Sequence, residues 1–284
     1  MTVVEATVHG AVSMVNAIAT GKGATIGIDT YVKTRLESSD GAGIYLSSDK
    51  KTISSRLINK VIEKIVPKQE LKRNKLKLDF SSDIPTGYGL KSSSAISSAV
   101  ALVCSKIFKP NMSDLEIIKV GVNASIETKV SLTGAYDDAC ACYFGGFNVT
   151  NNLKRRIVLQ HQAPTNLQVV IFIPRSRKRG NLKKLKDLTS AFEKAWNLAA
   201  DSDYWNAAIL NGIATSAILN SDPHIITNLI NSGALCATIS GNGPSIMAIT
   251  KKQNVTKVKK QFSSLDGRTI ISHINNKKAE VHEV

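Results

Sequence analysis

Hydrophobic and polar residues alternate over much of the first third of the chain. The ranges 2–8 and 25–36 are rich in Val, Ile and Thr, and Leu76, Leu78 and Phe80 stand at every second position. Successive side chains of a β-strand point to opposite faces, so this spacing is typical of strands with one buried face. We therefore predict strands in all three places.

Helical spacing of hydrophobic residues appears on either side of Leu76. Residues 50–66 carry apolar side chains three or four positions apart, and residues 93–108 are mostly apolar. This predicts an amphipathic helix and then a buried one. Ser113, followed by Glu116, has the form of a capping box and predicts the start of another helix. A third apolar stretch ends at Gly145 and Gly146.

The second half mixes strands and helices again, without a strict alternation of the two. We predict strands at 155–159, 167–173, 235–239, 246–250 and, as the last one, 268–274. Helices are predicted at 182–199, 204–219 and 254–265. This order is typical of an α+β fold with two halves, which we divide into domains 1–155 and 156–284.

Composition excludes several classes of protein. The chain has 284 residues, of which 43% are hydrophobic and 21% charged, as in ordinary folded domains. Its four cysteines have apolar neighbours and no zinc-site spacing, so we expect core thiols in a reducing compartment. We find no signal peptide and no apolar run of the length that spans a membrane. We therefore expect a cytoplasmic protein that does not bind membranes.

The net charge of +15 requires an anionic partner or a strongly solvated surface. Nucleic acid is one candidate, but the aromatic residues are few and do not interleave with the basic ones, which speaks against it. The densest group of cations lies at 175–186. It is either a solvated loop and helix start or a flap that closes over anions.

The most informative segment is DIPTGYGLKSSSA at 83–95, which follows a predicted strand and opens a predicted helix. Two glycines allow close backbone approach, Lys91 adds a cation, and three serines add hydroxyl donors. The helix start contributes unpaired N–H groups and the positive end of a dipole. The segment therefore predicts a polyphosphate cradle. It is not a Walker A loop, because the spacing of glycine, lysine and hydroxyl differs.

This segment resembles the second motif of the GHMP kinases, a family named for galactokinase, homoserine, mevalonate and phosphomevalonate kinases. TGAYDDACACYFGG at 133–146 resembles the family's catalytic segment, and SGNGPSI at 240–246 resembles its third, glycine-rich motif. Within the family the chain is most similar to archaeal-type shikimate kinases, through GLKSSSA and through NAIATGKGATIGID at 16–29. The resemblance runs from about residue 5 to residue 250.

The resemblance implies a ribosomal-S5-like N-terminal domain, a ferredoxin-like C-terminal domain and a site between them. It implies ATP and Mg²⁺ as cofactors and transfer of phosphate to the 3-hydroxyl of shikimate, with homoserine or mevalonate as alternative acceptors. Asp138 matches the catalytic aspartate, as a base or an orienting group, and its neighbour Asp137 is the alternative. Ser93 and Glu127 match the metal ligands. The nucleotide-binding residues it implies are Pro85, Gly87, Tyr88, Gly89, Leu90, Lys91, Ser92, Ser93 and Ser94.

Substrate contacts are expected at both ends of the chain. We expect them at Asn16, at Lys22 and at the turn made by Gly241, Asn242 and Gly243. This turn either approaches the substrate or closes the phosphate loop. One departure limits the comparison, since many relatives carry Pro-Gly followed by a cation near the N-terminus and this chain has His9-Gly10-Ala11. We therefore assign no role to a cation there. The sequence gives no prediction of the oligomeric state.

Overall fold

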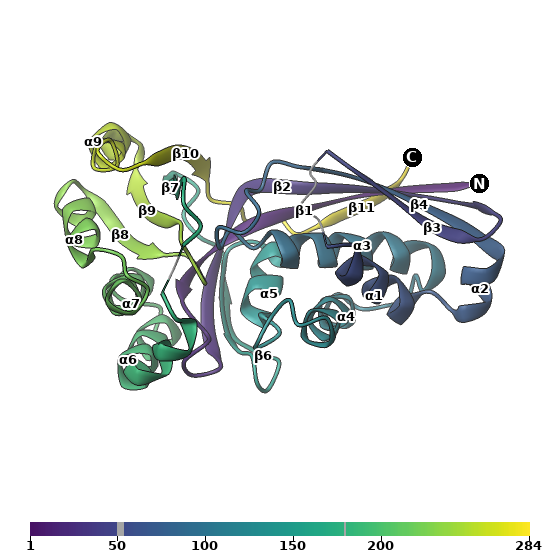
Figure 1. Ribbon diagram of the computed structural model, residues 1–284, viewed down its shortest axis with the longest axis horizontal. Helices are drawn as coiled ribbons and strands as arrows, with labels where there is room; N and C mark the ends of the chain where they lie inside the picture. Colours follow the sequence, from purple (N-terminus) through teal and green to yellow (C-terminus); the bar gives the residue numbers. More distant parts are fainter. Residues whose placement is uncertain (50–53, 179) are drawn as a thin grey trace.

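Two β-sheets and the helices packed on them make up the molecule (Figure 1). A computed structural model describes residues 1–49, 54–178 and 180–284. The first sheet has seven strands. Five follow the order β11-β1-β2-β4-β3. In addition, β5 pairs with the first residues of β2, and β6 pairs with β5. The second sheet has four strands in the order β10-β7-β9-β8.

The first sheet is built on two long strands, β1 (Thr2–Val15) and β2 (Lys22–Asp40). They pair antiparallel, with irregularities at His9/Gly10 and Ser13/Val15. Further along, β4 (Asn74–Ser82) pairs with β2, and β3 (Gly43–Ser48) lies parallel to β4 at the edge. β5 (Phe147–Asn151) and β6 (Arg156–His161) form a hairpin on β2. β11 (Glu280–Glu283) closes the other edge.

Four helices cover one face of this sheet, drawn below it in Figure 1. They are α1 (Ser55–Ile65), α3 (Ser92–Phe108), α4 (Asp114–Glu127) and α5 (Tyr136–Phe144), while the short α2 (Lys68–Arg73) lies at the end of the molecule. Of these, α3 is the central one, because it contacts β1, β2, α1, α4 and α5 and is buried over most of its length. The predicted buried helix and the capping box at Ser113 are thereby confirmed.

The second sheet contains β7 (Leu167–Pro174), β8 (Ala234–Ile239), β9 (Ile246–Lys251) and β10 (Gly267–His273). Around it lie α6 (Thr189–Ala200), α7 (Tyr204–Ile218), α8 (Pro223–Asn231) and α9 (Val255–Lys260). Helix α7 contacts both β8 and β1, so it joins the two sheets. The site described below depends on this junction.

Several boundaries differ from the predictions. The helix predicted at 182–199 is divided in two. A 3-10 helix, Leu182–Leu188, comes first and is capped by the Asn181 side chain, and α6 starts only at Thr189. The last helix is short, because the backbone N–H groups of Gln261, Phe262 and Ser263 bond three residues back and the α-helical pattern ends at Lys260. Residues 268–274 are not the last strand, because the four-residue β11 follows. Residues 50–53 of the first predicted helix lie outside the described residues.

The two sheets do not divide the chain at the boundary between the predicted domains, 1–155 and 156–284. β6 still pairs with β5, and the chain passes to the second sheet only between His161 and Leu167. The C-terminal strand then returns to the first sheet, which places both termini at the same end of the molecule (Figure 1). The first layer therefore contains the two ends of the chain, and the second layer lies between them in sequence.

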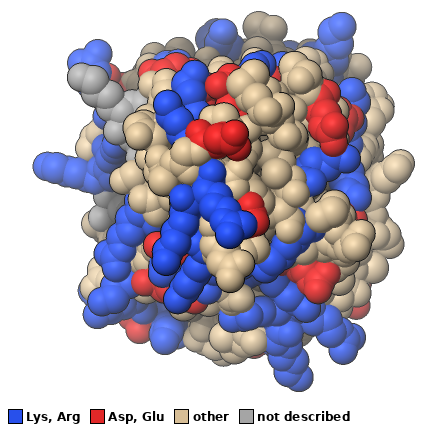
Figure 2. Space-filling view, turned by 90° about the vertical axis from the view of Figure 1, so that its right-hand side faces the viewer, with Lys and Arg blue, Asp and Glu red and all other residues tan. Residues whose placement is uncertain are grey.

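The surface carries its positive charge broadly. On the face shown in Figure 2, Lys and Arg side chains are spread widely, with Asp and Glu side chains between them. All four cysteines are buried and unpaired, as expected for core thiols. Within the described part of the chain, no helix is long and apolar enough to cross a membrane.

Candidate active site

A cavity of about 240 Å³ lies where the two sheets meet. Four parts of the chain line it: the end of β1, the loop before α3, the connection between α4 and α5, and the turn between β8 and β9. These segments are far apart in sequence, and they include parts of all the motifs singled out above. The lining contains Ser13, Asn16, Gly87, Gly89, Leu90, Lys91, Ser92, Ser93, Ser94, Ser125, Ser131, Thr133, Asp137, Asp138, Gly241 and Asn242.

The loop before α3 delivers the helix N-terminus to the cavity. Lys91 has a left-handed backbone (φ 65°) and begins α3 without a side-chain cap, while Ser92, Ser93 and Ser94 form the first turn and line the cavity. The first N–H groups of a helix have no partner within it, so they can bind an anion, and the helix dipole favours negative charge there. The loop therefore fits a phosphate group.

Gly89 permits the loop to touch the turn between β8 and β9. Its φ is +83°, and a Cβ there would lie 2.0 Å from the backbone oxygen of Ser240, so no side chain fits. The Ser240 hydroxyl donates to the Gly89 carbonyl (2.8 Å) and accepts from the Ser13 N–H (3.1 Å). The Ser245 hydroxyl donates to the Tyr88 carbonyl. The two glycine motifs therefore form one hydrogen-bonded unit.

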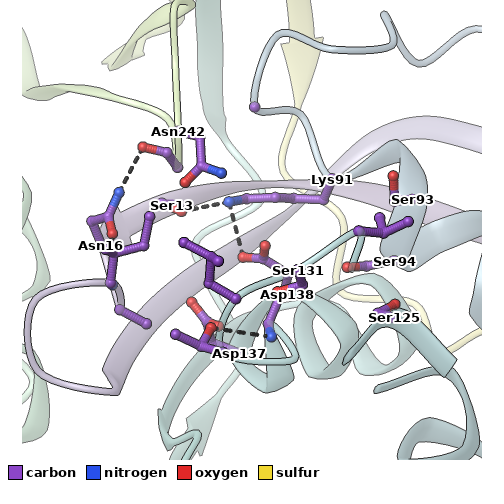
Figure 3. A pocket seen from close by; sticks show the side chains of 18 of the residues that line it. Ser13, Asn16, Lys91, Ser93, Ser94, Ser125, Ser131, Asp137, Asp138 and Asn242 are labelled. Carbon is purple, nitrogen blue, oxygen red and sulfur yellow. Dashed lines mark hydrogen bonds and ion pairs between the residues drawn. The ribbon is translucent and has the colours of Figure 1, made fainter. Parts of the chain in front are cut away.

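A buried ion pair crosses the cavity wall (Figure 3). The Lys91 Nζ lies 2.9 Å from Asp138 Oδ1 and donates to Ser13 Oγ at 2.6 Å. The Lys91 side chain is 5% exposed and that of Asp138 16%, so the pair is largely shielded from solvent but Asp138 still reaches the cavity. The pair ties the phosphate loop to α5 and to β1.

The environment of Asp138 suits a proton acceptor. Burial penalises its charged form and the nearby Asp137 adds repulsion, whereas Lys91 and Thr25 oppose both effects. The result is a pKa raised to about 7. A carboxyl group with such a pKa exchanges its proton near neutral pH, as a general base must.

Asp137 is held differently, although it also lines the cavity. It accepts hydrogen bonds from Asn152 Nδ2 (2.7 Å) and Thr25 Oγ1 (3.0 Å), and its N–H donates to Asn152 Oδ1 (3.1 Å). A Cβ on Gly23 would lie 2.3 Å from its carboxylate, so that glycine leaves room for it. These contacts bind both Asp137 oxygens to structural partners and leave Asp138 as the more available carboxylate.

Asn16 joins β1 to the second sheet. Its Nδ2 donates to the Gly241 carbonyl at 2.7 Å (Figure 3). Its N–H donates to Asn211 Oδ1 at 2.8 Å. Asn211 in turn donates to Thr238 Oγ1 at 2.7 Å. Asn16, Gly241 and Asn242 are therefore brought together at the cavity, as the substrate-binding prediction requires.

Other expected site residues lie elsewhere. Lys22 Nζ pairs with Glu193 at 2.9 Å and lies over the Trp196 ring, which links β2 to α6. Glu127, at the exposed end of α4, pairs with Lys64 of α1, and this hydrogen bond lowers its pKa. Glu127 does not line the cavity, whereas its predicted metal-binding partner Ser93 does. To bind a ligand there, Lys22 would have to leave Glu193, and Glu127 would have to leave Lys64.

Three further residues from the predictions support the loop rather than face the cavity. Tyr88 accepts hydrogen bonds from Ser245 through its carbonyl. Gly243 precedes Pro244 in a cis peptide bond within the turn between β8 and β9. Pro85 is buried at the start of the loop.

Sequence reasoning missed several polar lining residues. Ser13 lies beyond the strand predicted at 2–8, in the part of β1 that the sequence did not predict, and Ser125, Ser131 and Thr133 lie around the end of α4. Ser13, Ser125 and Ser131 belong to none of the motifs. The signals in the sequence were that Thr133 begins the predicted catalytic segment at 133–146 and that Ser131 lies just before it.

The cavity fits a nucleotide better than it fits a preformed metal site. The open first turn of α3, the Gly89 contact and Lys91 are suited to phosphate oxygens. Among the residues described, no three His, Cys, Asp or Glu side chains cluster as they would around a metal. Mg²⁺ needs no such cluster, because it takes one or two protein oxygens and completes its shell with phosphate and water. Ser93 and Asp138 are oxygen donors that line the cavity.

Comparison with known proteins agrees with this geometry. Residues 56–146 match the model for the N-terminal domain of GHMP kinases. The shikimate kinase of Methanothermobacter thermautotrophicus is 32% identical over 293 aligned positions, covering 100% of both chains. That of Methanosarcina mazei is 34% identical and covers 94% of this chain and 92% of its own. This chain belongs to the GHMP kinases, in the group of the archaeal shikimate kinases.

Solved structures confirm the fold of a GHMP kinase. A homoserine kinase from Cytophaga hutchinsonii superposes with a TM-score of 0.77 at 17% identity and covers 99% of this chain and 98% of its own. The mevalonate kinase of Methanococcus jannaschii gives 0.74 at 17% identity, with 96% and 98% covered. At such identities the likeness concerns the fold alone, and the predicted two-part α+β architecture is confirmed.

Proposed function

We propose that this GHMP kinase transfers the terminal phosphoryl group of ATP to the 3-hydroxyl of shikimate. The observation that carries the proposal is the cavity, which combines an uncapped helix N-terminus with a carboxyl group of pKa about 7. Full-length similarity to curated shikimate kinases supports the choice of acceptor. Homoserine and mevalonate remain the alternative acceptors, because kinases named for them share the fold.

ATP would bind with its phosphates on the loop at 87–94. The N–H groups of the first turn of α3 and the hydroxyls of Ser92, Ser93 and Ser94 supply donors, and Lys91 supplies charge. Phosphoryl transfer requires this positioning and charge neutralisation more than covalent chemistry. Mg²⁺, when bound, would neutralise phosphate charge further, with the Ser93 hydroxyl as the proposed ligand and Glu127 as a ligand only if it leaves Lys64.

Asp138 would accept the proton of the attacking hydroxyl. Its ionised carboxylate, which lies 2.9 Å from the Lys91 Nζ, orients the O–H bond. It takes the proton as the new O–P bond forms and the bond between the γ-phosphorus and the bridging oxygen breaks, with ADP as the leaving group. Asp137 would act as a positioning residue through Asn152 and Thr25. Asn16, Asn242, Ser131 and Thr133 line the cavity, and we propose that their polar groups would contact the polyhydroxylated acceptor.

The test is ADP release with Mg²⁺ and ATP in the presence of single acceptors. We expect turnover with shikimate and background rates with homoserine, mevalonate, galactose and no acceptor. Turnover with another acceptor of this panel would contradict the assignment of shikimate and retain the phosphate loop. Failure to bind ATP in any condition would contradict the proposal as a whole.

A further inference from the structure

An arginine from the second half of the chain reaches the phosphate loop. After β7 the chain crosses to the loop, and the Arg177 guanidinium lies 5.1 Å from the centre of the Tyr88 ring. It also lies alongside Gly87, where a Cβ would be 3.6 Å from one of its nitrogens. Gly87 lines the cavity, so Arg177 lies next to a lining residue, although it does not line the cavity itself.

The contact with Tyr88 uses only one part of the guanidinium. The Arg177 guanidinium lies over the Tyr88 ring, and its N–H donors lie along the edges of its own plane. Those edges match the oxygens of a phosphate group and can bind two of them at once. Within the described part of the chain, this guanidinium pairs with no carboxylate.

The residues that line the cavity carry too little positive charge to balance a polyphosphate, and Arg177 can add to it. Asp137 and Asp138 contribute negative charge, and Lys91 is the cation within the lining residues given above, already paired with Asp138. A polyphosphate adds several more negative charges to this space. Arg177 is an exposed side chain beside the phosphate loop, and a second cation there would offset part of this charge.

We propose that Arg177 binds the phosphates of the nucleotide, with the Tyr88 ring as the surface that holds its guanidinium over the phosphate loop. This inference rests on the proposed function, because it assigns the polyphosphate ligand to the same cavity. Arg177 thereby brings the second half of the chain into the nucleotide site through a residue outside the glycine motifs. Within the basic group at 175–186, the proposal assigns anion binding to Arg177 alone. Residue 179 of this group lies outside the described residues.

Arg175 provides a matched control. It carries the same side chain two residues earlier, is 84% exposed, and lies 3.4 Å from the carboxylate of Asp266. Removing it takes one positive charge from the same segment without touching the phosphate loop. Both alanine variants lose one positive charge, so a difference in their Mg-ADP affinity would come from the position of Arg177 and not from the change in net charge.

The experiment is calorimetric titration of Mg-ADP and of adenosine into the full chain. We expect Arg177→Ala to weaken Mg-ADP binding by about tenfold, the loss of one charge-assisted contact, and to leave adenosine binding unchanged. Arg177→Lys should recover part of the loss, because it keeps the charge and loses the planar fork. Arg175→Ala should bind both ligands as the wild type does.

Three outcomes would overturn the inference. Mg-ADP affinity in Arg177→Ala could equal that of Arg175→Ala, or adenosine and Mg-ADP could weaken equally, or only the KM for the acceptor could rise. All three leave the proposed kinase activity intact. Absence of Mg-ADP binding by the wild type would instead contradict the proposed function, and the inference with it.

Discussion

At the scale of single residues, the two adjacent aspartates show how position decides chemistry. Asp137 gives its oxygens to Asn152 and Thr25, whereas Asp138 faces Lys91 and the cavity. Helical geometry turns neighbouring side chains to different sides, so one carboxylate can be structural while the next stays available. The sequence singled out this pair but left the choice between its members open, because spacing alone allows a slip of one position.

The pH dependence of the reaction should follow Asp138. A base must be ionised, so kcat/KM should be low below the raised pKa of about 7, rise through it and level off above it. Asp137→Asn removes a charge that raises this pKa, and the rise should therefore move to lower pH. The pH–rate profiles of both proteins, with folding checked by circular dichroism, measure this. A profile that stays in place or moves to higher pH would contradict the account.

Lys22 and Glu127 show the limit of spacing as a guide. Both occupy positions that the resemblance marks, yet Lys22 pairs with Glu193 of α6 and Glu127 with Lys64 of α1. These partners lie 171 and 63 residues away in sequence. A motif fixes neither the partner nor the direction of a long side chain, so such contacts require the fold.

At the scale of elements, the phosphate loop and the turn between β8 and β9 act as one unit. The sequence identified each of them by its own glycines. It did not show that the Ser240 and Ser245 hydroxyls bond the turn to the carbonyls of Gly89 and Tyr88. The strands and helices around them follow from hydrophobic spacing, while this junction depends on long-range pairing that no local pattern records.

Ser240→Ala tests the junction. The hydroxyl is buried and bonds to two backbone groups, Gly89 O and Ser13 N, which would lose their partner. We expect a fall of about 1–3 kcal/mol in the free energy of unfolding and a higher KM for ATP, because the loop loses its support.

The matched control is Ser263→Ala, whose exposed hydroxyl bonds only to the Lys260 carbonyl. Urea unfolding and initial-rate measurements on both variants make the comparison. Equal unfolding free energies and equal KM values for the two variants would show that the turn and the loop are not coupled through Ser240.

At the scale of the whole molecule, the chain order conceals the layering. The first sheet takes strands from both ends of the chain, and the second sheet lies between them in sequence. A short final strand of four residues was beyond prediction, because its pairing with β1 is set by the tertiary fold. The α+β class and two halves were predictable, since they follow from element order.

The charge of +15 belongs to the same scale. Cations are spread over the face that Figure 2 shows, and a net positive charge attracts anionic small molecules. Charge alone does not distinguish a nucleotide from a nucleic acid. The cavity, whose polar lining residues surround a space of about 240 Å³, favours our proposal of a nucleotide.

The most direct test of the account compares the wild type with Asp138→Asn. Shikimate-dependent ADP release is measured at a pH above 7, together with Mg-ADP affinity. We predict that the variant loses on the order of 10²–10⁴ in rate, the usual contribution of a general base, while its Mg-ADP affinity stays near that of the wild type. A variant that turns over shikimate at the wild-type rate would contradict the central claim that Asp138 accepts the proton.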